Sequence, residues 1–153
     1  MNRMHSHDHA RKRRLDALAS SDPANLAERY AALEPSAPTA TPIRGPEIGM
    51  VMLRGRAGGG GAVFNLGEAT VTRSTVKLAT GEIGHAIVLG RQLQKAHIVA
   101  HLDALSQRPE WATVIETDFV TPALAEQDAA RTRQGEETEA TRVDFFTMVR
   151  GED

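Results

Sequence analysis

A run of short β-prone segments between residues 48 and 90 constrains the fold more than any other feature of the sequence. Segments 48–57, 62–67, 68–79 and 81–90 are rich in Val, Ile, Leu and Thr, and glycines lie at or between their ends. Connections this short can join antiparallel neighbours, whereas a parallel crossover needs a dozen or more residues. The sequence therefore predicts three or four strands in an antiparallel meander.

Helical patterns are found on both sides of these strands. Before them, Leu26, Tyr30 and Leu33 recur at helical spacing, with Ser21 or Asp22 as the expected cap. After them, we expect a helix over residues 91–107 that ends at Pro109, an unassigned stretch over 110–120, and a polar helix over 121–143 capped by Thr121. The predicted fold class is α+β, an antiparallel sheet of 3–5 strands flanked by N-terminal and C-terminal helices.

The chain of 153 residues fits a single domain. Residues 1–13 are expected to be a disordered lead-in, residues 14–153 the domain, and the Pro/Ser/Thr-rich residues 34–42 a linker within it.

Composition excludes several classes of function. There is no cysteine, which rules out disulfides, thiolate catalysis and Cys-ligated metal in this chain. No apolar run has the length of a membrane span, and the N-terminus lacks a hydrophobic signal core, so a cytoplasmic protein without membrane contact is expected. Nucleic-acid binding is disfavoured, because the basic middle of the chain has no stacking aromatics.

Charge is unevenly distributed along the chain. Residues 42–101 carry 7 Lys and Arg against 3 Asp and Glu, whereas residues 102–153 carry 5 against 12. Five cations of the middle region are candidates for binding phosphate, because arginine grips phosphate oxygens in pairs. The alternative is an ordinary solvated sheet face. The candidates are Arg54, Arg56, Arg73, Lys77 and Arg91.

Two other motifs indicate weaker possibilities. The glycines of residues 58–61 suit a phosphate-binding loop, but no Gly-Lys-Ser/Thr leads into a helix, so a flexible hairpin loop is favoured. The spacing of His97 and His101 is that of a two-histidine metal pair, yet the motif glutamate is absent, which favours a solvated or partner-facing pair and no metal site. His5, His7 and His9 have no other expected ligand nearby.

No Ser-His-Asp set and no matched carboxylate pair is visible in the sequence, so the catalytic residues, if any, are unknown.

The C-terminal segment, residues 141–153, is unusually apolar for a chain end. Half of the four phenylalanines of the chain lie in it. We expect it to dock on a partner through apolar side chains, with charged neighbours fixing the register; the alternative is that it folds back onto the domain's own sheet. The interface candidates are Arg142, Val143, Asp144, Phe145, Phe146, Met148, Val149 and Arg150.

Four stretches of the sequence resemble one known family. They are TRVDFFTMVRGED (141–153), FNLGEATVTRSTVKLATGEIGHAIVLGR (64–91), AHLDAL (100–105) and LAERYAAL (26–33). Together they are similar to the PhnG family, which supplies one subunit of the bacterial carbon–phosphorus lyase core complex, over roughly residues 14–153.

The resemblance implies a function that composition does not show. Members of this family work with the sister H, I and L subunits, which together displace adenine from ATP with an alkylphosphonate and form a ribose 1-alkylphosphonate 5-triphosphate. A radical enzyme, the J subunit, later breaks the carbon–phosphorus bond. The resemblance implies a hetero-oligomer in which the I subunit is the catalytic partner, ATP is a substrate of the complex, and this chain alone binds no cofactor.

Three classes of function remain open on the residues alone. The chain is a non-catalytic scaffold, a subunit lending cations such as Arg73, Lys77 or Arg91 to a shared site, or an independent small-anion-binding module.

Overall fold

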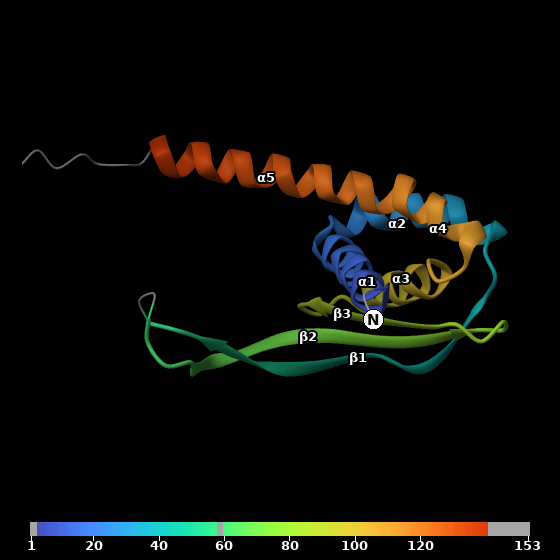
Figure 1. Ribbon diagram of the computed structural model, residues 1–153, viewed down its shortest axis with the longest axis horizontal. Helices are drawn as coiled ribbons and strands as arrows, with labels where there is room; N and C mark the ends of the chain where they lie inside the picture. Colours follow the sequence, from blue (N-terminus) through green and yellow to red (C-terminus); the bar gives the residue numbers. More distant parts are fainter. Residues whose placement is uncertain (1–2, 58–59, 141–153) are drawn as a thin grey trace, which may run out of the picture.

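The β-prone block folds into one three-stranded antiparallel sheet (Figure 1). Its strands are β1 (Ala40–Gly55), β2 (Phe64–Leu78) and β3 (Ile83–Leu89), in the order β1-β2-β3. The computed structural model describes the backbone of residues 3–57 and 60–140, and the side chains of residues 9–57 and 60–139. The predicted α+β class and the antiparallel meander are confirmed.

The strands are longer than the sequence pattern indicated. β2 joins the two segments expected over 62–67 and 68–79, and it pairs with β1 from Phe64 to Leu78. Gly67, which looked like a break, has a φ of +151° and lies where the register shifts between Leu53 and Arg54. Glycine tolerates this backbone conformation, so the strand continues through an irregularity instead of turning.

One face of the sheet is covered by α3 (Leu93–Leu105). Along β3 the buried residues are Gly84, Ala86 and Val88, which alternate with exposed ones. A Cβ atom on Gly84 would lie 1.9 Å from the carbonyl oxygen of Ala100 and 2.6 Å from the amide nitrogen of Ala104. The absence of a side chain at Gly84 therefore lets the backbone of α3 approach the sheet directly.

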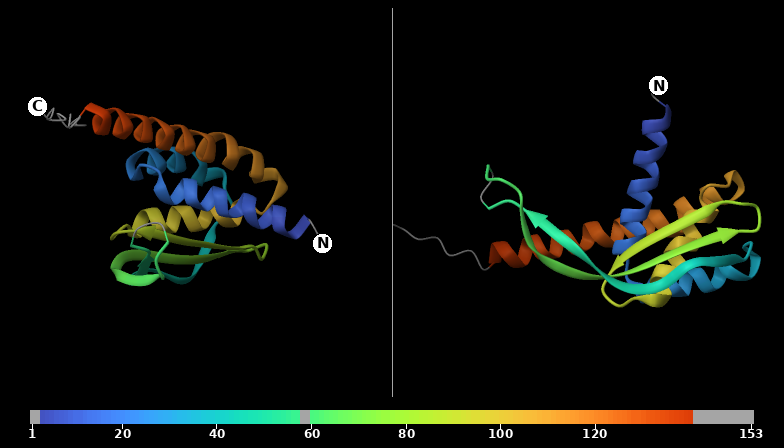
Figure 2. Two further views of the ribbon diagram at one scale, coloured as in Figure 1. Left: turned by 60° about the vertical axis from the view of Figure 1, so that its left-hand side comes forward. Right: turned by 90° about the horizontal axis from the view of Figure 1, so that it is seen from below.

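The other helices build layers above α3. Figure 1 and Figure 2 show every described helix on the same side of the sheet, with α1 and α3 nearest to it and α2 and α5 farther away. Their bounds are α1 (Arg3–Ser20), α2 (Pro23–Leu33), α4 (Pro109–Ile115) and α5 (Thr121–Ala140), with a short 3₁₀ turn η1 (Glu34–Ser36) and a π-helical turn η2 (Glu116–Val120).

Helix α1 begins at Arg3, within the expected disordered lead-in of residues 1–13. Two long-range contacts hold this part of the helix. Arg11 donates to both carboxylate oxygens of Asp103, at 3.0 and 2.6 Å, and Arg13 donates to Glu116 at 2.9 and 2.8 Å. Ion pairs with residues far along the chain therefore order a segment that looks polar and solvated by itself.

The helix boundaries also differ from the local signals in two places. Pro109 begins α4 instead of only ending the helix before it, and Thr121 caps nothing, because α4 runs through the π-helical turn into α5. The cap of α2 is as predicted: Asp22 accepts hydrogen bonds from the amides of Ala24 and Asn25, at 2.9 and 3.0 Å.

The core lies between the sheet and the helices. Its largest fully buried apolar side chains come from α1, β2, α3 and α4, which ties all the layers together. They include Leu18, Leu78, Ile98, Leu102, Leu105 and Ile115. Within the described residues, no helix has both the length and the apolar character that crossing a membrane requires.

Two glycine substitutions test the close approach of α3. Gly84→Ala is expected to lower the free energy of unfolding by about 1–3 kcal/mol, because the new methyl group meets backbone atoms of α3. Gly135→Ala is the matched control. It lies within α5 with nothing within 4 Å of the added methyl group, and it is expected to stabilise by about 0.5–1 kcal/mol. Urea denaturation measures both, and a Gly84→Ala protein as stable as the wild type would contradict the close contact.

Candidate functional site

The second face of the sheet is open to solvent in the described part of the chain (Figure 1). The residues of β3 on this face include Ile87 and Leu89, which are 59% and 71% exposed. Cross-strand pairing places Arg73 opposite Ile87 and Lys77 opposite Ile83. The open face is therefore aliphatic along β3 and cationic along β2, a combination that suits contact with another macromolecule.

The five candidate cations do not form one cluster. Arg73 and Lys77 share the open face, as their spacing predicted, but four residues of strand separate them by roughly 13 Å. Arg54 lies at the far end of β1 and Arg56 just beyond it, while Arg91 follows β3 at the entrance to α3.

Arg73 is the most constrained of these cations. Its guanidinium lies 3.2 Å from the carboxylate of Glu47, which also pairs with Arg44 at 2.7 Å. The Nε atom of Arg73 is buried and has no hydrogen-bond partner among the described residues. The Arg73 side chain is therefore half-exposed, held by an ion pair at one end and with its Nε atom buried and unpaired within the described part of the chain.

The β1–β2 hairpin extends well beyond β3. Since β3 pairs with β2 only over Val71–Lys77, residues 50–57 and 60–70 form a two-stranded projection, here called the arm, which Figure 2 shows leaving the body of the molecule. Its large apolar side chains are exposed to between 40% and 64%. They are Met50, Met52, Leu53, Val63, Phe64 and Leu66.

The glycine-rich loop lies at the tip of the arm. Residues 58–59 lie outside the described residues, and Gly60 and Gly61 lead into β2. The loop joins two antiparallel strands, which confirms the hairpin-loop interpretation. A phosphate cradle of the usual kind needs a helix N-terminus after the loop, and a strand follows here.

His101 is buried and hydrogen-bonded at both ring nitrogens. Nε2 lies 2.8 Å from the carbonyl oxygen of Pro38, and Nδ1 lies 2.7 Å from the Tyr30 hydroxyl. A carbonyl oxygen only accepts, so Nε2 carries the proton, and Nδ1 accepts from the Tyr30 hydroxyl. Burial lowers the pKa of His101, and burial, with the Glu34 carboxylate as a smaller cause, raises the pKa of Tyr30 to about 12.

The expectation that His97 and His101 form a solvated or partner-facing pair is wrong for His101, which is 3% exposed. A metal at this pair would have to break the Tyr30 or Pro38 hydrogen bond. Within the described residues no group of three or more His, Asp or Glu side chains is arranged to hold a metal ion. The side chains of His5 and His7 are outside the described residues, and His9 is exposed.

Two buried charges were missed by sequence reasoning. Asp103 accepts hydrogen bonds from Arg11 and from the backbone amide of His85, at 2.9 Å for the latter. Lys95 donates to the carbonyl oxygens of Ala19 and Ser21, at 2.7 and 2.6 Å, and burial lowers its pKa. The lysine thus satisfies carbonyls at the end of α1, where a cation is favoured.

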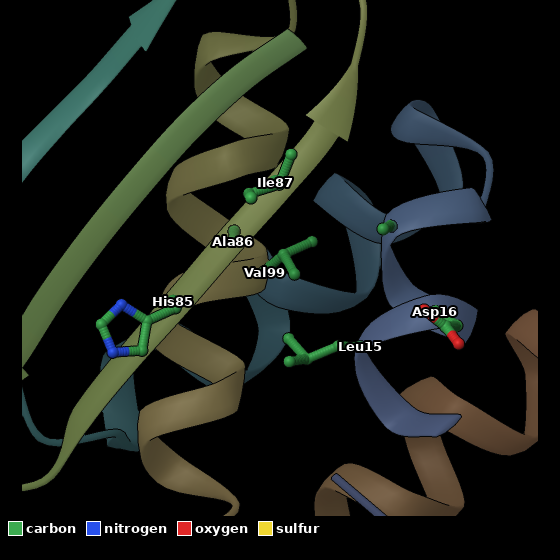
Figure 3. A pocket seen from close by; sticks show the side chains of 7 residues that line it. Leu15, Asp16, His85, Ala86, Ile87 and Val99 are labelled. Carbon is green, nitrogen blue, oxygen red and sulfur yellow. The ribbon is translucent and has the colours of Figure 1, made fainter. Parts of the chain in front are cut away.

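A small hollow of about 240 Å³ lies between α1 and β3 (Figure 3). Its lining is mostly apolar, with Leu15 and Val99 at the centre of the view. The two polar side chains do not converge: the His85 ring lies on the far side of β3 from Asp16. The hollow therefore offers no acid–base pair, and its shape suits packing better than catalysis.

The C-terminal segment lies outside the described residues. Its expected interface residues, Arg142 to Arg150, are therefore not placed by the structure. The open face and the arm were not predicted from the sequence as binding surfaces. One signal was available, because Ile83, Ile87 and Leu89 are apolar at alternate positions opposite the buried ones, so both faces of β3 are apolar.

The pH dependence of stability tests the role of His101. Because its pKa is lowered in the folded protein, its contribution is fully present above its ordinary pKa of 6.5 and declines as the pH falls below that value. His101→Gln is expected to lose about 1–3 kcal/mol of unfolding free energy at pH 7.5, and the difference from the wild type should narrow toward pH 5. The exposed His85→Gln is the control. A difference that is constant between pH 7.5 and pH 5 would contradict the neutral, buried state of His101.

Comparison with known proteins identifies a family and a relative of this chain. The family model described as "Phosphonate metabolism protein PhnG" matches residues 9–151. A curated relative from Rhizobium meliloti (strain 1021), named alpha-D-ribose 1-methylphosphonate 5-triphosphate synthase subunit PhnG, is 46% identical over 161 residues, covering 91% of this chain and 99% of the relative. With a family model matched over almost its whole length and a relative of this similarity, the chain belongs to the PhnG family of phosphonate metabolism proteins.

Proposed function

We propose that this chain is a non-autonomous subunit of a ribose 1-methylphosphonate 5-triphosphate synthase in the cytoplasm. It works with the sister H, I and L subunits in the transfer of the ribose triphosphate of ATP to an alkylphosphonate, with release of adenine, and it joins a larger assembly that includes the J subunit. ATP is a substrate of the assembly, and this chain binds no cofactor by itself.

The observation that carries the proposal is the 46% identity with a relative that is named as a subunit of this synthase. Two features of the molecule support it. The open sheet face and the arm expose aliphatic side chains that a solitary protein would normally cover. The hollow beside α1 has no convergent polar groups of the kind that catalysis requires.

The C-terminal segment is proposed as one of the surfaces that dock on a sister subunit. Full burial of a Phe, Met or Val side chain is worth about 1.5–3 kcal/mol, so several together offset the cost of ordering a chain end. Arg142, Asp144 and Arg150 would then fix the register through polar contacts.

Truncation of this segment tests the docking role. Deletion of residues 143–153 is expected to leave the thermal midpoint within a few degrees of the wild type and to abolish co-purification with the I subunit, because the apolar anchor is removed. Deletion of residues 151–153 alone is the matched control, since it removes no apolar anchor. Native mass measurement of the co-expressed subunits gives the readout. A folded 143–153 deletion that still assembles would contradict the docking role.

A second candidate is that the chain lends cations to a shared active site. It is favoured by Lys77, which is exposed on the open face, and by the half-exposed guanidinium of Arg73 on the same face. Such donors stabilise charge that develops on phosphate and leaving-group oxygens.

Neutralisation of these cations separates the two candidates. If they act in a shared site, Arg73→Gln with Lys77→Gln should lower turnover of the reconstituted complex about 10²-fold while the subunits still assemble. The control, Lys12→Gln with Arg131→Gln, removes the same charge from exposed helix positions. Turnover within twofold of the wild type would rule out the shared site and leave the scaffold role. Strong ATP binding by the isolated chain in calorimetry would instead favour an independent anion-binding module.

A further inference from the structure

We propose that the arm, residues 50–57 and 60–70, inserts into an apolar groove of a sister subunit, with both of its faces covered and with carboxylates of the partner around Arg54 and Arg56. This inference rests on the proposed function and adds a surface distinct from the C-terminal segment. The partner surface that receives the arm is a protein groove with aliphatic walls and an acidic end.

The distribution of apolar side chains on the arm requires cover on two sides. Met50 and Met52 pair with Thr70 and Glu68, and so lie on the face that α3 covers farther along the sheet. They are 64% and 51% exposed, because α3 does not reach them.

The opposite face of the arm is also apolar. Leu53 points to this face and is 44% exposed. Phe64 pairs with Gly55, and Leu66 lies over Gly55, where an added Cβ would be 2.5 Å from Leu66 Cδ1. An antiparallel ribbon that rests on a single partner surface is expected to have one polar face. Apolar groups on both faces indicate insertion instead.

The edges of the arm point to the same conclusion. Beyond β3, the outer edge of β2 has no neighbouring strand among the described residues, and β1 is an edge strand throughout. A two-stranded ribbon is only marginally stable in water by itself. The body half of β1 is protected from strand addition by Pro42, Pro46 and two register shifts, whereas residues 50–70 contain no proline and one register shift, between Leu53 and Arg54. The less protected part of the edge is therefore the part that we assign to the partner.

Charge defines the end of the groove. Arg54 and Arg56 are exposed, and Glu68 is the only carboxylate between residues 50 and 70. No ion pair of Arg54 or Arg56 is found among the described residues. Guanidinium groups that leave water on insertion need carboxylates to replace their hydration, so the partner must supply them.

A second copy of this chain is a poor occupant. A group of three glutamates, Glu136, Glu137 and Glu139, lies in the second half of α5, where residues 131–139 are exposed and almost entirely polar. This surface could attract the arginines but has no aliphatic walls for Met50, Met52 and Leu66. Self-association through the arm is therefore an outcome that would overturn the proposal.

The experiment compares three arm variants in the co-expressed assembly. Met50→Ser with Met52→Ser alters one face, Leu53→Ser with Leu66→Ser alters the other, and Arg54→Glu with Arg56→Glu reverses the charge at the tip. All six side chains are exposed, so the thermal midpoints of the isolated variants should stay close to that of the wild type. Ile43→Ser with Leu93→Ser, two exposed aliphatic side chains away from the arm and from β3, is the matched control for loss of exposed aliphatic groups.

We expect each arm variant to weaken assembly at least tenfold, and more strongly than the control, in native mass titrations with the sister subunits. In hydrogen exchange, the backbone amides of residues 50–57 and 60–70 should exchange at least tenfold more slowly in the wild-type assembly than in the isolated chain. If only one of the two apolar double variants weakens assembly, insertion is overturned in favour of docking through a single face of the arm. If the isolated chain forms a dimer, and Met50→Ser with Met52→Ser dissociates it, a second copy is the partner and the proposal is overturned.

The two proposals fail in different ways. A wild-type chain that does not join the H, I and L subunits contradicts the proposed function, and the arm inference falls with it. A wild-type chain that assembles while all three arm variants assemble equally well contradicts the arm inference alone.

Discussion

The close packing of α3 on the sheet is the contact on which the rest of this structure depends. It is possible because Gly84 has no side chain, so that the carbonyl of Ala100 and the amide of Ala104 approach the β3 backbone. From this position α3 is covered by the sheet on one side and by α1 and α2 on the other, and Ala96, Val99, Ala100, Leu102, Ala104 and Leu105 are completely buried. Because this one-sided core holds all the described helices, none of them covers the other face of the sheet.

Buried polar groups fix the helices around α3 in a single arrangement. Asp103 joins α1 and β3 through Arg11 and the amide of His85, Lys95 holds the end of α1, and His101 links α2 to the segment before β1. Each group comes from α3, and each has hydrogen-bond partners that offset part of the cost of its burial. Because hydrogen bonds are directional, these side chains fix the orientation of the elements that they join to α3, in addition to the apolar contacts.

The sequence predicted the elements whose signals lie within a short stretch of the chain. The meander, the helix after β3, the Asp22 cap and the shared face of Arg73 and Lys77 all follow from periods and caps that a short window contains. The extension of α1 did not follow, because the Arg11–Asp103 contact joins residues 92 positions apart.

The candidate site was less predictable than the fold, again for a physical reason. A period of two says which strand residues share a face, but it does not say which face the helices cover or how far that cover extends. The sequence of β2 is equally strand-like inside and outside the body, and only the end of β3 at Leu89 decides where the arm begins. The placement of the arm is therefore a property of topology, which the periodic pattern does not encode.

The separation between a closed core and an open sheet has an energetic consequence. Side chains such as Met50, Leu66 and Leu89 gain little from folding because they stay largely in water, so most of their burial free energy, about 1.5–3 kcal/mol each, is still available for association. The same exposure is a hazard for aggregation, since bare strand edges and aliphatic patches bind without discrimination. In the described residues the hazard is reduced by prolines on β1 and by cations on both β1 and β2. These features limit indiscriminate association of the free subunit. On the proposal above, the groove that receives the arm differs from a random hydrophobic surface because it has carboxylates placed for Arg54 and Arg56. Selectivity at this surface would then come from charge, and affinity from the apolar side chains on either side of it.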